Sequence, residues 1–411
     1  MRPFDEYGVI FSIILSPIVM YVVRDVKLFK SLLPFYVLST IILYLSIYDF
    51  MPSSWTHYRD AYAALRQWSW LPILTASSTI FYYFIRYNWG FLSRYSLMLA
   101  VALFAASRLS RYALYGFDPN PSGIDSVDLY FYIYGLDNEN SAIFLLMTVY
   151  ILYASRSLVM SILVGLLLLL LCSSASSQAA ALFVLLMLIP IYRKQMVAGV
   201  AILSVLFVLV SQTFPTQIFA YDKNTAFRGI LWRDAALAVT DTNGLGVGYG
   251  TEYIRNDFRS IPAVFDRYIE ESSKDRLFVG THSSIYDVMM RAGILGFALL
   301  IFGLWNALKG QVFGGHYRRL YLGLIGVLII NNSFNMGLAS INLTYGAALF
   351  FAMIMAARDL SQRQAGRQAQ RRATAARRSP GQLPGRSPAV REIAFAGRPP
   401  PPRTPRHGTG S

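Results

Sequence analysis

The segment SLVMSILVGLLLLLLC, residues 157–172, contains no charged side chain. A helix crosses the apolar core of a bilayer with about 20 mostly apolar residues, or somewhat fewer where flanking side chains reach the headgroups. This segment therefore predicts a membrane-spanning helix and sets the fold class. Its last residue, Cys172, is the only cysteine of the chain, so an intrachain disulfide and a cysteine-based metal motif are excluded.

The composition of the whole chain agrees with a lipid environment. Of its 411 residues, 55% are hydrophobic and only 14% are charged, whereas roughly 25% are charged in soluble domains. Apolar runs of sufficient length predict an all-α polytopic membrane protein with about 11–12 transmembrane helices. The clearest runs lie near residues 8–23, 33–49, 71–86, 92–107, 141–154, 157–172, 178–192, 196–213, 285–307, 319–335 and 340–357.

Lys and Arg residues test this arrangement, because they are enriched in cytoplasmic loops. We therefore place the C-terminus in the cytoplasm, which puts the long loop 214–284 on the opposite side of the membrane. An additional helix in VDLYFYIYG, residues 127–135, would move the N-terminus to the cytoplasm but would leave this loop in place. With this orientation the basic loop residues all fall on the cytoplasmic side: Arg24, Lys27, Lys30, Arg86, Arg94, Arg156, Arg193, Lys194, Lys309, Arg318 and Arg319.

These features divide the chain into four parts. Residues 1–213 and 285–357 contain the N-terminal and C-terminal transmembrane helices, 214–284 form the large extracytoplasmic loop, and 358–411 form a basic tail. The tail has 12 Arg and two acidic residues but no periodic apolar face, so we expect it to be disordered in the cytoplasm. We expect its partner to be anionic membrane lipid and not nucleic acid.

The long loop contains the motifs that point to function. Residues 228–239 carry apolar side chains at helical spacing and predict an amphipathic helix at the membrane surface, with Arg228 in its first turn. The stretch GLGVGYG, residues 244–250, is not followed by Lys-Ser/Thr and does not follow a strand, which argues against a nucleotide loop. We interpret it as a tight turn where backbone approaches backbone or substrate, with anion binding by its N–H groups as a secondary interpretation.

His282 lies at the start of the helix predicted over residues 285–307. An imidazole at the membrane surface can take a proton from an acceptor hydroxyl near neutral pH, although an ordinary interfacial histidine also fits this position. On a regular helix, Gly293 and Gly296 would lie about 20° and 40° from His282 around the axis. These small residues would let another helix pack closely and hold the imidazole in place.

Several arginines could contact a substrate. A pyrophosphate group needs one or two guanidinium partners, and Arg228 is the first choice because few acidic residues neighbour it. Arg255, Arg259 and Arg233 are further substrate-binding candidates, and Tyr249 could stack on a sugar ring. Arg291 is a fifth substrate-binding candidate, but its spacing from Asp287 favours a structural ion pair within the membrane.

The segment HSSIYDVMMRAGILG resembles the signature of the O-antigen ligase and O-antigen polymerase superfamily. In that signature, His is followed by Asn, Ser or Gln, nine residues, Gly, two residues, and then Gly, Thr or Tyr. His282, Ser283, Gly293 and Gly296 match the defined positions. RGILW (228–232) and NGLGVGYGT (243–251) are similar to the stretch that opens the family's periplasmic loop. SSASSQAAALFVLLML (173–188) is similar to the start of an earlier helix, with Gln178 where Arg is common.

The resemblance implies a metal-independent, inverting glycosyltransferase of the bacterial inner membrane with a GT-C-like fold, no cofactor and a periplasmic active loop. Its donor would be an undecaprenyl-pyrophosphate-linked glycan, and its acceptor a sugar hydroxyl. By the same resemblance, His282 would be the catalytic base and Arg228 a catalytic contact to the pyrophosphate. Such a polymerase extends lipid-linked repeat units of surface polysaccharide, and a chain-length regulator and a flippase would be its partners.

Other functions remain open from the sequence. An O-antigen ligase would use the same chemistry with lipid A core as acceptor, and no residue separates it from a polymerase. A lipid-linked oligosaccharide flippase would place polar groups near the midplane, and Asn331, Asn332 and Asn335 keep this alternative in view. A non-catalytic scaffold would leave His282 and the loop arginines replaceable.

Overall fold

The computed structural model describes residues 27–48, 50, 60–115, 138–155, 157–172, 174–189, 193–219, 223–253, 280–310, 315–334 and 341–378, with five positions before residue 27. Across these ranges the regular structure is helical, which confirms the all-α class. The helices are α3 (Lys27–Ile47), α4 (Ala61–Trp68), α5 (Trp70–Tyr87), α6 (Trp89–Tyr115), α8 (Asn138–Ala154), α9 (Leu158–Leu171), α10 (Ala175–Leu186), α11 (Arg193–Thr213), α12 (Pro215–Phe219), α13 (Lys223–Asp241), α15 (Ser284–Leu308), α16 (Gly315–Phe334) and α17 (Ile341–Arg378).

Four of these helices are long and apolar enough to cross a membrane. They are α3, residues Trp89–Ala106 of α6, residues Lys194–Thr213 of α11, and α15. Residues Ser141–Ala154 of α8, together with α9 and α10, form shorter apolar helices. These helices agree with the prediction of a helical membrane protein, while the total of about 11–12 transmembrane helices stays a prediction. The predicted span 8–23 lies largely outside the described residues.

Polar residues at helix starts explain where several of these elements begin. The carboxylate of Asp60 accepts a hydrogen bond of 2.7 Å from the N–H of Ala63 and caps α4. Ser157 and Ser174 cap α9 and α10 in the same way. Because side-chain oxygens satisfy N–H groups that lack partners in the first turn, these residues end the preceding loops.

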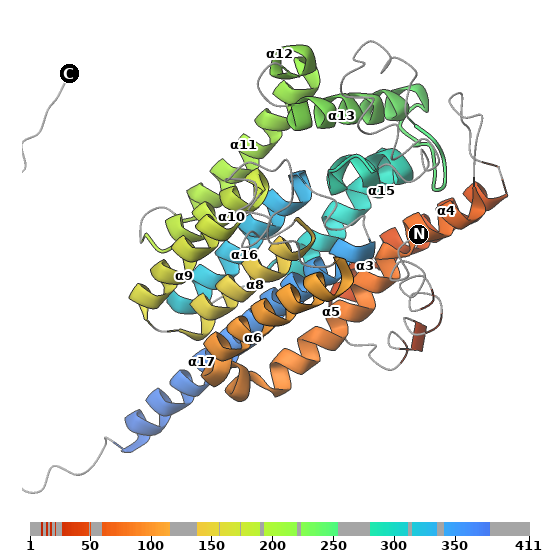
Figure 1. Cartoon of the computed structure of the whole chain (residues 1–411). Helices are drawn as coiled ribbons and strands as arrows, with labels where there is room; N and C mark the ends of the chain where they lie inside the picture. Colours follow the sequence, from red (N-terminus) through yellow and green to blue (C-terminus); the bar gives the residue numbers. More distant parts are fainter. Residues whose placement is uncertain are drawn as a thin grey trace, which may run out of the picture. The chain divides into compact units, whose positions relative to one another are not determined.

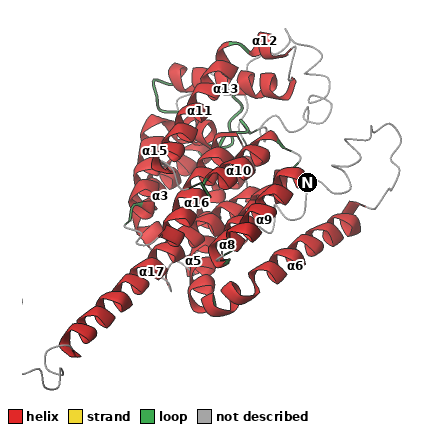
Figure 2. Cartoon of the chain, turned by 90° about the vertical axis from the view of Figure 1, so that its left-hand side faces the viewer, coloured by secondary structure: helices red, strands yellow, loops and turns green. Residues whose placement is uncertain are grey.

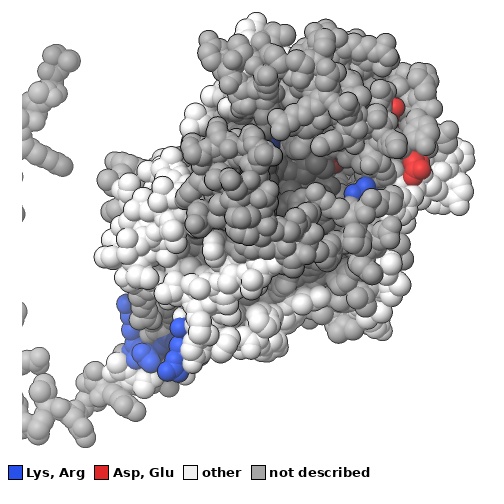
Figure 3. All heavy atoms as spheres, in the orientation of Figure 1, with Lys and Arg blue, Asp and Glu red and all other residues white. Residues whose placement is uncertain are grey.

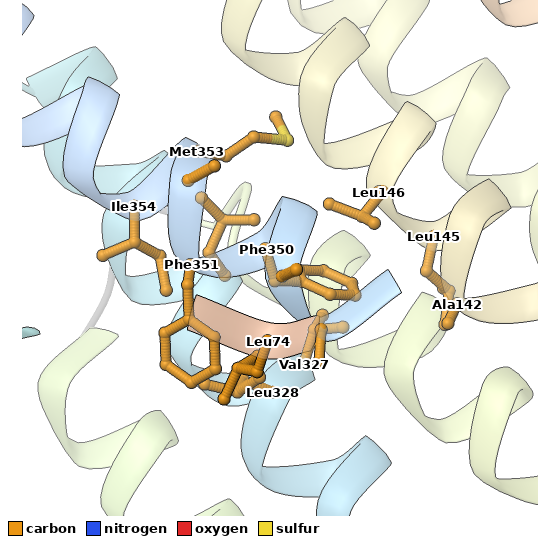
Figure 4. Close-up of a cluster of buried hydrophobic side chains, with 14 of the residues drawn as sticks. Leu74, Ala142, Leu145, Leu146, Val327, Leu328, Phe350, Phe351, Met353 and Ile354 are labelled. Carbon is orange, nitrogen blue, oxygen red and sulfur yellow. The ribbon is translucent and has the colours of Figure 1, made fainter. Parts of the chain in front are cut away.

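The centre of the core is formed by α5 and the first part of α17. Most residues of α5 are buried, and α17 is buried nearly continuously from Ala347 to Ala357. Figure 4 shows four side chains of this part of α17 among Leu74 of α5 and residues of α8 and α16. The four are Phe350, Phe351, Met353 and Ile354.

Helices α3 and α15 pack closely because α15 carries glycines on the shared face. A Cβ atom at Gly303 would lie 2.6 Å from the carbonyl oxygen of Ser31, so only glycine fits there. Gly296 also lies beside α3, where its nearest neighbour in that helix is Phe35. Small residues at such positions bring helix backbones together within a membrane. The predicted helix contact at Gly296 is therefore confirmed.

Helices α12 and α13 lie across one end of the bundle in both views (Figures 1 and 2). The helix predicted over residues 228–239 corresponds to α13, which packs against α11 and α15. In Figure 3 the described charged residues visible on one face form small groups.

The tail departs from its prediction. Contacts divide the chain into residues 1–362 and 363–411, and α17 continues through the boundary to Arg378. The expectation of disorder from residue 358 is therefore wrong for the first part of the tail, because its Ala, Arg and Gln residues have high helix propensity. Residues 379–411 lie outside the described part of the chain.

Candidate functional site

Helix α13 places Arg228 at the end of the bundle. Gly229 allows this approach, because a Cβ atom there would lie 2.1 Å from the carbonyl oxygen of Ser211 in α11. The guanidinium of Arg228 donates a hydrogen bond of 3.1 Å to the carbonyl oxygen of Phe334, at the end of α16. A cation is favourable there because the C-terminal end of a helix carries partial negative charge.

His282 lies in a turn immediately before α15. Its φ of 54° is in the left-handed region, which non-glycine residues seldom adopt. The turn is fixed by its neighbours: the indole N–H of Trp232 donates to the carbonyl oxygen of Thr281 at 2.8 Å, and the hydroxyl of Thr281 donates to the carbonyl oxygen of Ser283 at 2.7 Å. His282 itself remains partly exposed.

Arg228 and His282 act on each other electrostatically. Burial is the main cause that lowers the pKa of His282 to about 4, and the positive charge of Arg228 lowers it further. The imidazole is therefore neutral at pH 7, the form that can accept a proton. The structure thus brings together the two residues that the sequence singled out as base and pyrophosphate contact.

An apolar cavity of about 640 Å³ opens beside Arg228. It lies between α10, α11, α13 and α16, and most of its lining side chains are aliphatic or aromatic, such as Leu203, Phe207 and Phe334. Arg228 and Trp232 line it from α13, whereas His282 does not line it. Arg228 therefore lines the cavity and is also near enough to His282 to affect the pKa of its imidazole.

The glycine-rich stretch inserts into a break in α15. Gly293 has φ 71° and interrupts the helix, and its conformation leaves backbone groups that the stretch satisfies. The N–H of Val247 donates to the carbonyl oxygen of Met290 at 2.8 Å, and the N–H of Ile294 donates to that of Gly244 at 2.9 Å. The sequence interpretation of close backbone approach is therefore confirmed.

Two other expectations at this place are wrong. The regular helical register that put Gly293 below His282 does not apply, because α15 breaks at Gly293 and the glycine stretch packs there. Most N–H groups of the stretch already have protein acceptors. They belong to Gly244, Leu245, Gly246, Val247, Tyr249 and Gly250, which removes the basis for anion binding by these groups.

Arg291 of α15 and Tyr249 of the glycine stretch are both buried. Arg291 donates hydrogen bonds to the carbonyl oxygens of Gly248 and Thr251, and its guanidinium lies 5.6 Å from the ring centre of Tyr253. Tyr249 is 2% exposed, and its hydroxyl lies 2.6 Å from that of Ser39. These positions favour structural roles over direct contact with a substrate.

The other predicted residues fall in different environments. Arg233 is exposed on α13, and Arg255 and Arg259 lie outside the described residues. Asp234 is 1% exposed. Its position among Leu231, Ala235 and Ala238 on the buried face of α13 is a sequence signal of this burial. Gln178, which replaces a common Arg in the resemblance, donates to the carbonyl oxygen of Cys172 at 2.9 Å.

Within the described ranges, no three His, Cys, Asp or Glu side chains gather in a metal-binding arrangement. Comparisons with protein-family models, curated proteins and solved structures give no match to the chain. The fold and the site therefore define a class, an α-helical protein with apolar helices long enough to cross a membrane, in which an arginine that lines an apolar cavity lowers the pKa of a nearby histidine.

Proposed function

We propose that the protein is an inverting, metal-independent glycosyltransferase that acts on polyprenyl-pyrophosphate-linked glycans, and specifically a polymerase of lipid-linked repeat units for a surface polysaccharide. The observation that carries this proposal is that Arg228, which lines an apolar cavity, is near enough to His282 to help keep its imidazole neutral. This combination suits a substrate with a hydrocarbon chain, an anionic group and a reacting hydroxyl partner.

In the proposed reaction, Nδ1 or Nε2 of neutral His282 takes the proton from an acceptor sugar hydroxyl. The hydroxyl oxygen attacks the anomeric carbon of the donor, a new glycosidic bond forms, and the bond from that carbon to the pyrophosphate oxygen breaks. Polyprenyl pyrophosphate leaves with the bonding electrons, and Arg228 stabilises its increasing negative charge. Attack opposite to the leaving group inverts the anomeric configuration.

The cavity beside Arg228 supplies the reason to favour a lipid-linked donor. Isoprene units would occupy the aliphatic lining between α10, α11 and α16, since burying apolar surface stabilises by about 25 cal/mol per Å². The pyrophosphate would then lie at the polar end, near the guanidinium. A donor carried by a soluble nucleotide would have no use for this lining.

The proposal also includes a location. We place the protein in a bacterial inner membrane, with His282 and Arg228 on the periplasmic side and α17 ending in the cytoplasm, because the loop arginines and lysines then follow the positive-inside rule. A GT-C-like arrangement of about 11–12 transmembrane helices, a flippase that delivers the donor, and a chain-length regulator belong to the same proposal.

The test uses purified protein in nanodiscs with a defined polyprenyl-pyrophosphate-linked repeat unit. Wild-type protein should produce longer lipid-linked glycans and free polyprenyl pyrophosphate. His282→Ala should lower the rate of elongation about 10²–10⁴-fold, to a residual rate that can still be measured, while the amount of folded protein, followed by gel filtration, stays constant. Full elongation by folded His282→Ala protein would contradict the base assignment and the proposed chemistry.

Two alternatives have specific support. A ligase would use the same two residues, and cells that lack the protein distinguish it: a polymerase leaves single repeat units, while a ligase leaves long chains unattached to lipid A core. A flippase is favoured by the break in α15 at Gly293, because transporters often use discontinuous helices. It would move donor across vesicles without consuming it and would tolerate His282→Ala.

A further inference from the structure

The backbone before α15 is held at Thr281 from two sides. The carbonyl oxygen of Thr281 accepts a hydrogen bond from Trp232 of α13, and its N–H donates to the carboxylate of Asp287 in the first turns of α15. Both backbone hydrogen-bonding groups of Thr281, its N–H and its carbonyl oxygen, are therefore used. His282 is the next residue, so its position is set by these two contacts.

The contacts at Thr281 hold the neighbouring His282 in an unfavourable backbone conformation. A φ of 54° is unfavourable for a residue with a Cβ atom, and such conformations persist where surrounding contacts determine them. Thr281 and Ser283 are both buried and bonded to each other. The imidazole is thus presented from a fixed turn to the partly exposed side of the site.

Asp287 is itself fixed by a second set of contacts. Its carboxylate interacts with the guanidinium of Arg291, one helical turn further along α15. Arg291 in turn binds the carbonyl oxygens of Gly248 and Thr251. The contacts form a continuous series from the glycine stretch through Arg291 and Asp287 to Thr281.

We propose that Asp287 and Arg291 are positioning residues for the base: they hold the backbone of Thr281, and through it the imidazole of His282, in the orientation that reaches the acceptor hydroxyl. This inference rests on the proposed function for its catalytic meaning. It assigns a role to two buried, oppositely charged side chains that interact electrostatically. Displacing a reacting group by about 1 Å can cost on the order of 100-fold in rate.

The first experiment compares three variants at the same helix turn. Asp287→Leu removes the acceptor for the Thr281 N–H and should lower kcat about 10–100-fold with little change in KM for the donor, the size typical of supporting partners. Asp287→Asn keeps an oxygen acceptor and should recover part of kcat. Tyr286→Phe is the control, since it loses its 2.8 Å hydrogen bond to Gln212 without touching the Thr281 turn.

A double-variant cycle separates positioning from general stability. If Asp287 acts through His282, then Asp287→Leu should have no further effect in the His282→Ala background, because the group it positions is absent. Independent, multiplying losses would overturn the proposal. Trp232→Phe keeps the ring beside Tyr286 but loses the bond to Thr281, and it provides the same test if Asp287→Leu protein does not fold.

A second measurement does not depend on activity. In protein with ¹⁵N-labelled histidine, His282 should give one sharp imidazole resonance in wild type and in Tyr286→Phe, and shifted or multiple resonances in Asp287→Leu. An unchanged resonance in Asp287→Leu would overturn the positioning role. A fully active His282→Ala protein would instead remove the proposed function, and the resonance would still decide whether Asp287 fixes the turn.

Discussion

Burial and the positive charge of Arg228 both lower the pKa of His282, and binding of an anionic substrate would change the effect of the charge. Burial and the charge of Arg228 lower the pKa to about 4 in the free protein, which makes the imidazole neutral but weakly basic. A bound pyrophosphate would offset the charge of Arg228, so the pKa of His282 should rise in the donor complex. The proposed base would thus become stronger only when a donor is in place.

This electrostatic coupling predicts a pH dependence. The acid limb of kcat/KM reports the free enzyme, so it should lie near pH 4 instead of near 6.5, and activity should persist as the pH falls from 7 to 5. Arg228→Gln should move this limb of the residual activity upward, because a nearby cation is removed. Arg94→Gln, an equivalent change at an exposed position of α6, should leave it in place.

Stability should follow the same pKa difference. The ordinary pKa of histidine is 6.5 and that of folded His282 is about 4, so between these values the unfolded chain binds more protons at this site. The free energy of unfolding should therefore fall as the pH falls from 6.5 to 4 and be unaffected by this group above 6.5. Thermal unfolding of His282→Gln protein should show a weaker pH dependence, and an identical dependence would contradict the assignment.

Arg228 offers a test of leaving-group stabilisation. Arg228→Ala should lower kcat about 10²–10³-fold, the effect of losing one donor to a developing charge. Arg228→Lys should lie between this variant and wild type, because lysine keeps the charge but not the planar pair of donors. Rates are measured as release of polyprenyl pyrophosphate, and equal activity of all three proteins would exclude Arg228 from the site.

At the scale of residues, the sequence indicates the candidate residues better than the contacts that support them. His282 stands out because it precedes a predicted helix, and Arg228 because few acidic residues neighbour it; their catalytic roles stay predictions. The contacts that fix them, from Trp232 and Asp287 to Thr281, join segments that are far apart in sequence. Spacing along one helix cannot reveal such contacts.

At the scale of elements, the close contact between the glycine stretch and α15 predicts how substitutions of glycine change the stability of the protein. A Cβ atom at Gly246 would lie 2.6 Å from the carbonyl oxygen of Met290, and the residue has φ 80°. Gly246→Ala should therefore destabilise the protein by about 1–3 kcal/mol or more, since a strained backbone adds to the clash. Gly199→Ala in α11, where no atom lies within 4 Å, should be neutral or slightly stabilising.

Thermal unfolding in detergent measures both variants. If Gly246→Ala were as stable as Gly199→Ala, the close contact between the glycine stretch and α15 would be incorrect.

Most helices themselves were predictable from the sequence, since their apolar runs are continuous. The break at Gly293 was not, because a glycine in an apolar run is also compatible with an uninterrupted helix.

At the scale of the whole molecule, the cavity between α10, α11, α13 and α16 predicts a variant with altered donor binding. Ala179 lines this cavity from α10, and Ala179→Phe should fill part of it. KM for a long polyprenyl donor should rise about 10-fold or more, because apolar contacts are lost, while a short-chain donor should be affected less. Val159→Phe, at an exposed position of α9 outside the cavity lining, is the matched control.

Equal effects of Ala179→Phe on long and short donors would show that the cavity does not hold the polyprenyl chain.

The cavity could not be predicted from the composition of the sequence. Hydropathy identified a helical membrane protein, but it assigned every apolar run the same role. Which apolar faces meet each other and which enclose a space depends on contacts such as those of α11 with α16 and α13, and these have no local signature in the sequence.

The hydrogen-bonded contact between the glycine stretch and α15 also bears on which parts of the sequence can change during evolution. Hydrogen bonds join Val247 to Met290 and Gly244 to Ile294, so these two parts of the chain are held together independently of the sequence between them. Substitutions within residues 254–279 can therefore accumulate in descendants of this chain while the contact between the glycine stretch and α15 is retained.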